Sequence, residues 1–280
     1  MKRKSNFSTI MLVLMLIVGL SLLLYPSFSD YWNSFTQSRA IVSYAEQLQN
    51  MDEDQFADLW AEAHAYNASL LERYNVFLLT EEQQAQYPTL LNIGNDGIMG
   101  YIEIPKIGVT LPLYHGTEDS VLSVAIGHIE WTSLPVGGES THCVVSGHRG
   151  LPSAKLFTDL DELTEEDIFT LNVLGEILTY QVNQIKVVEP FDTSDLLVVE
   201  GEDYCTLVTC TPYGINSHRL LVRGTRIENA EEFSVKRATA DAVRIQPILV
   251  APLLAAPILL VLLVLVLWPK PKKYRKKDER

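Results

Sequence analysis

Two apolar runs, one near each end of the 280-residue chain, constrain it most. Residues 10–24 are apolar except for Gly19 and Ser21, and residues 248–268 carry no charge. A helix needs about 20 apolar residues to cross a bilayer, so the second run is long enough and the first is shorter. The first run predicts either an uncleaved anchor or a cleaved signal peptide. The residues after it contain no clear small-x-small cleavage site, which favours the anchor.

Basic residues stand on the outer side of both runs. Lys2, Arg3 and Lys4 precede the first run, and six lysines and arginines between residues 270 and 277 follow the second. Because basic flanks stay in the cytoplasm, both termini are expected there, with the segment between the runs outside. The net charge is −13, and setting the basic ends aside leaves a still more acidic middle. This charge argues against nucleic acid as a partner, whereas the basic tail suits a membrane.

The three cysteines, Cys143, Cys205 and Cys210, do not predict a disulfide scaffold, because their number is odd. At least one thiol stays free or pairs with another chain. The sequence has no C-x-x-C pair, so a structural zinc site of the usual spacing is not expected. The acidic residues follow no calcium-loop pattern, and we predict neither a metal nor a cofactor.

The chain changes from a helical to a β texture near residue 98. Residues 36–80 lack glycine and proline and carry apolar residues at helical spacing, with a polar break where Asp52 or Asp54 caps a second helix. Residues 83–97 are interpreted as a loop, because polar residues, proline and glycine interrupt the pattern. The expected strands are 99–104, 109–114, 125–131, 142–147, 167–174, 177–188, 204–209 and 220–227.

About eight short strands with few helices predict a mainly β fold that closes, or nearly closes, into a barrel. The expected organisation begins with a cytoplasmic basic end and an N-terminal transmembrane anchor or signal, and it ends with a second transmembrane helix and a basic cytoplasmic tail. Its parts are 1–28 (basic end and anchor), 29–97 (helical extension and possible lid loop), 98–228 (catalytic β-barrel), 229–244 (linker), 245–269 (transmembrane helix) and 270–280 (tail).

Two segments carry the reactive side chains. Residues 144–152 contain His148, and residues 204–214 contain Cys210, with Arg219 close behind. Both segments run from an expected strand into a loop, which fixes a side chain while leaving it accessible. Side chains alternate along a strand, so Cys205 and Cys210 point to opposite faces, one core and one presented. We interpret Cys143 and Cys205 as core residues.

The chemistry predicted for this set is nucleophilic attack by a thiol. A thiol attacks an amide as its thiolate, which nearby cations stabilise. His148 suits the role of acid and base, and Arg219 suits that of a cation holding a carbonyl or an oxyanion. The residues alone leave other readings open: Cys210 as a buried apolar residue, Arg219 as a surface cation, and His128, which also follows a glycine, as the histidine.

The run from Thr206 to Cys210, with Arg219 nine residues later and His148 on the preceding segment, resembles the signature of sortases. Residues 127–138, 148–163 and 209–226 resemble class C, the pilus-building sortases of Gram-positive bacteria. The resemblance implies an eight-stranded β-barrel and the catalytic set His148, Cys210 and Arg219. It also favours His148 over His128, which is then expected to hydrogen-bond locally.

The resemblance further implies a thioester on the cysteine and cleavage of an LPXTG-like sorting signal between Thr and Gly. The acyl group then passes to an amine, which is a pilin lysine in class C, or a cell-wall amine where a surface protein is anchored. Most class C members have a lid with an Asp-Pro-aromatic motif, but this sequence contains no Asp-Pro. Residues 83–97 are therefore expected to shield the site only weakly. Two alternatives stay open: a cysteine peptidase that releases its product to water, and a barrel that binds surface proteins without catalysis.

Overall fold

A computed structural model describes residues 7–229. The chain divides into two compact units, the first of which includes the described residues up to Phe28, while the second begins at Ser29. The helix α1 (Phe7–Gln49) crosses this boundary. Among the described residues it is the one helix that is long and apolar enough to cross a membrane. The expected second span, 245–269, and the tail lie outside the described residues, as does most of the linker.

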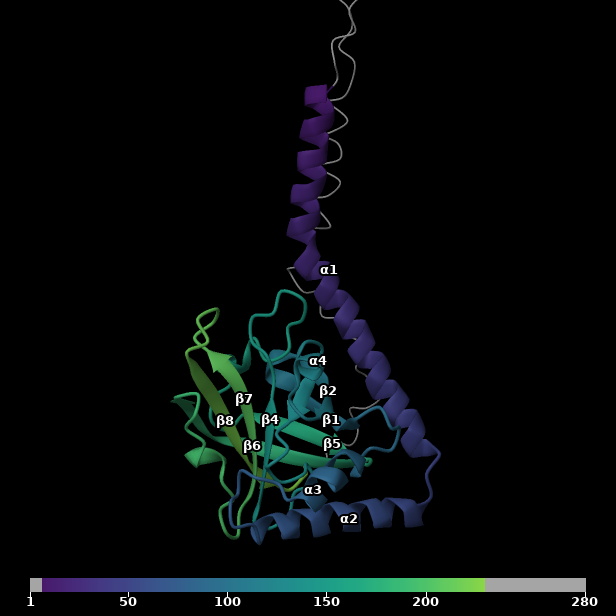
Figure 1. Ribbon diagram of the computed structural model, residues 1–280, viewed down its shortest axis with the longest axis vertical. Coiled ribbons are helices and arrows are strands. Elements are labelled where there is room, and N and C mark those ends of the chain that lie inside the picture. Colours follow the sequence, from purple (N-terminus) through teal and green to yellow (C-terminus); the bar gives the residue numbers. More distant parts are fainter. Residues whose placement is uncertain (1–6, 230–280) are drawn as a thin grey trace, which may run out of the picture. The chain divides into compact units, whose positions relative to one another are not determined.

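The second unit contains a closed barrel of eight strands, as the sequence predicts (Figure 1). Around the barrel the strands follow the order β1-β2-β3-β4-β7-β8-β6-β5, with β2–β3 and β4–β7 parallel and the other neighbours antiparallel. Their bounds are β1 Ile98–Ile104, β2 Val109–His115, β3 Ile126–His128, β4 Thr141–Ser146, β5 Ile168–Val173, β6 Glu176–Val188, β7 Asp203–Thr211 and β8 His218–Ile227.

Short helices lie in the connections between these strands. They are η2 (Pro105–Ile107), α4 (Asp119–Leu122), η3 (Leu160–Glu162) and η4 (Ser194–Leu196). The alternation expected along β7 is confirmed, because Cys205 and Leu207 belong to the main core inside the barrel, whereas Val208 packs in a separate cluster. Cys143 and Cys205 are 2% and 0% exposed, which confirms them as core residues.

The helices before the barrel are fastened to it by polar side chains. In α1, the buried Tyr44 hydroxyl donates to Met99 O and accepts from Leu174 N–H. In α2 (Glu53–Leu71), Asn67 accepts from Leu134 N–H at 2.7 Å. Asp52 caps α2, as the sequence suggests, by accepting from Gln55 N–H. The bonds of Tyr44 and Asn67 satisfy backbone groups that would otherwise be buried without partners.

Two expectations about this region are wrong. The second helix ends at Leu71 and does not reach residue 80. Residues 83–97 are not simply a loop, because they include most of α3 (Glu81–Gln86) and all of η1 (Tyr87–Thr89), with Leu90 and Leu91 in the core. In Figure 1, α3 lies beside α2, at the far end of the barrel from the β7–β8 connection. The segment therefore serves as packing, and a deletion of it would remove core residues.

The strand expected at 125–131 also ends early, at His128, and Tyr87 helps to explain why. The Tyr87 hydroxyl lies 3.0 Å from His128 Nδ1, and it accepts from Gly116 N–H at 3.0 Å. His128 Nε2 lies 2.8 Å from Ser133 O, so this nitrogen donates and Nδ1 accepts from Tyr87. These bonds turn the chain after His128 and attach η1 to the barrel.

We predict that Tyr87→Phe destabilises the fold by about 1–3 kcal/mol, because it leaves the buried Gly116 N–H and His128 Nδ1 without this partner. Urea unfolding of the full-length protein in detergent measures the change. Tyr74→Phe is the control, since Tyr74 is fully exposed and should unfold like the wild type. Equal stability of both variants would contradict the anchoring role of Tyr87.

Candidate active site

The parallel pairing of β4 with β7 brings the two reactive segments together. The last pair in this ladder is Ser146 with Val208. β4 ends at Ser146, so His148 lies two residues beyond the ladder, at the level of Cys210 when the register is extended. On β7, Cys210 lies on the same face as Val208, because side chains repeat their direction every two residues. His148 and Cys210 are partly exposed, so both are accessible.

The backbone around His148 is held on both sides. Gly147 N–H donates to Val208 O at 3.0 Å, and Gly147 O accepts from the Thr209 hydroxyl at 2.7 Å. Phe157 N–H donates to His148 O. A Cβ on Gly147 would lie 2.6 Å from the Phe157 ring, so glycine is required for this close approach. The segment Gly147-His148 therefore continues the β4–β7 pairing before it turns away.

Arg219 is the partner of Cys210 in the antiparallel β7–β8 ladder. Both residues lie inside strands, β7 and β8. The strands expected at 204–209 and 220–227 therefore stop one residue short of them. One guanidinium nitrogen, Nη1, donates to the carbonyls of His218 and Asn216 at 3.1 and 3.3 Å. Within residues 7–229 no carboxylate pairs with Arg219, which leaves its other donors available for a substrate oxygen.

The competing thiols and the competing histidine are buried. Cys143 and Cys205 are ladder partners in β4 and β7 on the core side. Burial raises the pKa of the Cys205 thiol, which keeps it protonated. His128 is fully buried and has partners for both ring nitrogens, as local hydrogen bonding predicts. The partly exposed thiol of Cys210 is therefore the candidate nucleophile among the three.

Residues 102–227 match the family model of the sortase domain. The crystal structure of sortase C1 from Streptococcus agalactiae has 49% identity and a TM-score of 0.66, covering 69% of this chain and 100% of that one. Sortase C of Streptococcus pneumoniae has 44% identity and a TM-score of 0.62, covering 68% of this chain and 97% of that one. The chain belongs to the sortase family, in class C.

Sortases are cysteine transpeptidases, so the chain carries the domain of an enzyme family of that class. Sortase D of Bacillus subtilis (strain 168) is 30% identical over 131 residues, which is 46% of this chain. The alignment covers 63% of that relative, so the chain spans less than two thirds of its length. The class C structures, by contrast, are covered almost completely.

Sequence reasoning missed an apolar strip that runs along the outer face of this sortase barrel. The pair Val208–Leu221 lies two residues before the pair Cys210–Arg219 along the ladder, which is one row away on the same face of the sheet. Leu196 of η4 packs on this pair. The strip consists of Val144, Leu196, Val208 and Leu221, with Ile129, Trp131 and Val188 packed against them. Leu196 and Trp131 also line a cavity of about 530 Å³, which Cys210 does not border. The strip thus leads from this cavity to the row of Cys210.

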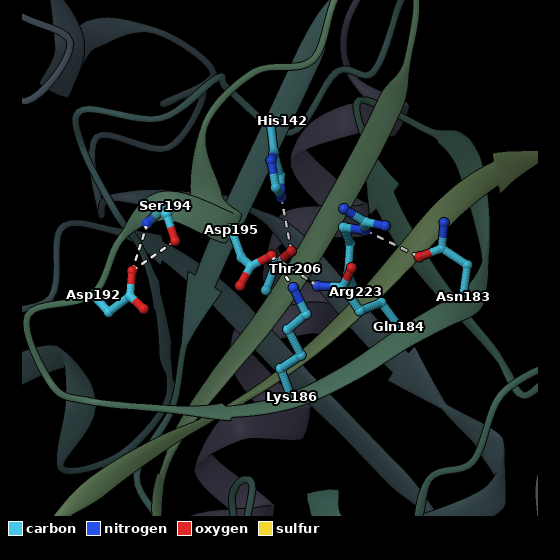
Figure 2. A network of polar contacts seen from close by, with 9 residues as sticks. All are labelled: His142, Asn183, Gln184, Lys186, Asp192, Ser194, Asp195, Thr206 and Arg223. Carbon is cyan, nitrogen blue, oxygen red and sulfur yellow. Dashed lines mark hydrogen bonds and ion pairs between the residues drawn. The ribbon is translucent and has the colours of Figure 1, made fainter.

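A polar network holds the β6–β7 connection over this face, and Figure 2 shows its members. Asp195 accepts from Lys186 Nζ at 2.6 Å and from Gln184 at 3.2 Å. His142 Nε2 lies 2.7 Å from the Thr206 hydroxyl, and its Nδ1 donates to Leu197 O at 2.9 Å. The loop that carries Leu196 is therefore tied to β4, β6 and β7. The spacing of these residues in the sequence matches no known motif, so the contacts could not be predicted from it.

His142 makes this network sensitive to acid. Burial, and secondarily the nearby charge of Arg223, lowers the pKa of His142 to about 4, against about 6.5 for an unfolded histidine. The folded state thus holds His142 neutral, while the unfolded chain takes up a proton. The resulting stability is fully present above pH 6.5 and is lost as the pH falls from 6.5 towards 4.

We predict that the sortase loses about 2 kcal/mol between pH 7 and pH 5 through His142, and that His142→Gln does not. Glutamine can donate and accept at this position but does not titrate. Urea unfolding at several pH values, compared between the two proteins, isolates this contribution from that of the carboxylates. Identical pH dependence in both would show that His142 is not held neutral by the fold.

Proposed function

We propose that this chain is a membrane-anchored cysteine transpeptidase that cleaves an LPXTG-like sorting signal between Thr and Gly and passes the acyl group to an amine, a pilin lysine. The observation that carries the proposal is the row across the β4, β7 and β8 wall. Cys210 and Arg219 are ladder partners, and extending the β4–β7 register two residues past its last pair, Ser146 with Val208, puts His148 at the level of Cys210. Family membership supplies the reaction class.

In the proposed first step, the Cys210 thiolate attacks the carbonyl carbon of the threonine. The free donors of Arg219 bind the oxyanion of the tetrahedral intermediate. The C–N bond then breaks, and His148 as imidazolium gives its proton to the departing glycine amine, leaving a thioester. In the second step the lysine amine attacks the thioester and His148 takes up its proton. The new amide forms and the Cys210 thiolate is released.

The apolar strip suits the residues that precede the scissile bond. Val208 and Leu221 lie in the row next to Cys210 and Arg219, and Leu196 closes over them. An extended peptide that ends at Cys210 would lay its apolar side chains along this strip, towards the cavity at Trp131. The polar network of Figure 2 would then set the width of the groove, because it holds the loop carrying Leu196.

The acceptor and the topology follow from the family and the sequence. The Streptococcus pneumoniae relative is described for its pilin substrate specificity, which supports a pilin lysine as acceptor here. The apolar part of α1 is the proposed N-terminal anchor. With residues 245–269 as a second span, both termini are cytoplasmic and the barrel faces outward, where surface proteins are assembled.

We predict that full-length protein in detergent forms a hydroxylamine-labile acyl adduct with an LPXTG-type peptide, visible by intact mass. The adduct should be absent in Cys210→Ala and present in Cys143→Ala and Cys205→Ala, the matched controls, because those thiols are buried. With an added amine, the peptide should become amide-linked to it. Hydrolysed peptide alone would indicate a peptidase. Binding of the peptide with no adduct would indicate a non-catalytic barrel.

We also predict that Arg219→Lys lowers turnover on the order of 100-fold, the loss typical when an oxyanion donor is removed. An ammonium group keeps the charge but cannot bind the two carbonyls and a substrate oxygen with a fixed fork of donors. Arg39→Lys is the control, since Arg39 is an exposed arginine on α1. Peptide cleavage rates decide, and near wild-type turnover of Arg219→Lys would remove Arg219 from the mechanism.

A further inference from the structure

Arg149 follows His148 directly, and its side chain crosses to the β7–β8 connection. Its Nη2 forms an ion pair with Asp161 at 2.5 Å, and its Nη1 donates to the Thr211 hydroxyl at 3.4 Å. The guanidinium carbon lies 5.9 Å from the centre of the Tyr213 ring. With a side chain only 10% exposed, Arg149 is mostly covered by these groups.

Arg149 and Thr211 each follow a residue of the proposed reactive pair. Arg149 comes directly after His148, beyond the end of β4 at Ser146, and Thr211 is the last residue of β7, directly after Cys210. The contact between their side chains therefore joins the two chain segments one residue past His148 and Cys210.

The two sides of this contact are held in different ways. Asp161 belongs to η3, whose first residue, Leu160, is fully buried in the core. On the other side, Gly150 has a φ of +75°, and a Cβ there would lie 2.9 Å from the Tyr213 ring, so the β4–β5 connection and Tyr213 are in close contact. Arg149 links Asp161, through its ion pair, to the Tyr213 ring.

Stability alone does not account for this arrangement. Asp161 is 48% exposed on its side chain, and exposed ion pairs contribute little to the free energy of unfolding. Arg149 Nε is buried and has no hydrogen-bond partner among the described residues, which costs stability. The contacts instead fix the distance between the two chain segments that carry His148 and Cys210. Reactions of bound groups are sensitive to such separations.

We propose that Arg149, held by Asp161, Thr211 and Tyr213, is a positioning residue that sets the distance between the His148 imidazole and the Cys210 thiol. This inference rests on the proposed transpeptidase function. Arg149 contacts neither the substrate nor the reacting atoms. It acts by holding together the segment that follows β4 and the end of β7, one residue past the reactive pair.

The test is steady-state cleavage of the sorting peptide by the full-length protein. Arg149→Met should lower kcat on the order of 100-fold while KM for the peptide stays within about two-fold, because the groove is unchanged and the reacting groups are misplaced. Arg149→Lys keeps a cation for Asp161 and Tyr213 and should recover part of the loss. Lys106→Met is the control, since it breaks a comparable ion pair, Lys106–Asp167, elsewhere on the barrel and should leave kcat unchanged.

Two further variants keep the proposal testable if Arg149→Met does not fold. Asp161→Asn and Thr211→Val each remove one contact while Arg149 remains, and each should lower kcat with an unchanged unfolding temperature. Wild-type kcat in both, or a lysine variant no better than the methionine one, would overturn the role. A wild-type protein that forms no acyl adduct would overturn the proposed function instead, which separates the two failures.

Discussion

The parallel pairing of β4 with β7 is the interaction on which the site depends. Parallel neighbours point their carboxyl ends to the same edge, so the ends of two strands about 60 residues apart in sequence meet there. The connection between them, which contains β5 and β6, closes the other side of the barrel. A slip of one residue in the register of β7 would turn Cys210 towards the core.

The same register distributes roles between the two faces of the wall. One face receives Cys143, Cys205 and Leu207, which the core buries. The other receives Val208, which packs with Leu196 of the β6–β7 connection, and Cys210, which is partly exposed. Because Asp195 and His142 hold that connection, the apolar strip and Cys210 lie on one framework.

Much of this arrangement is predictable from the sequence. Short β-branched segments locate the eight strands, and alternation along β7 separates Cys205 from Cys210. Alternation shows which face a side chain takes but not which strand lies beside it, so the pairing of β4 with β7 is not readable. The segment after Gln83 is misread for a related reason. Its polar composition suggests a loop. The residues that hydrogen-bond to the buried Tyr87, which are His128 and Gly116, are distant in sequence and cannot be recognised from it.

The contrast between Cys205 and Cys210 shows how a fold assigns reactivity to identical side chains. The two thiols lie five residues apart on β7, so they face opposite sides of the sheet. Burial raises the pKa of Cys205, and a protonated thiol is a poor nucleophile. Cys210 is partly exposed, with Arg219 as its ladder partner. An even spacing would have left both thiols on one face. The odd spacing is therefore what lets a single strand contribute one thiol to the core and present the other on the opposite face.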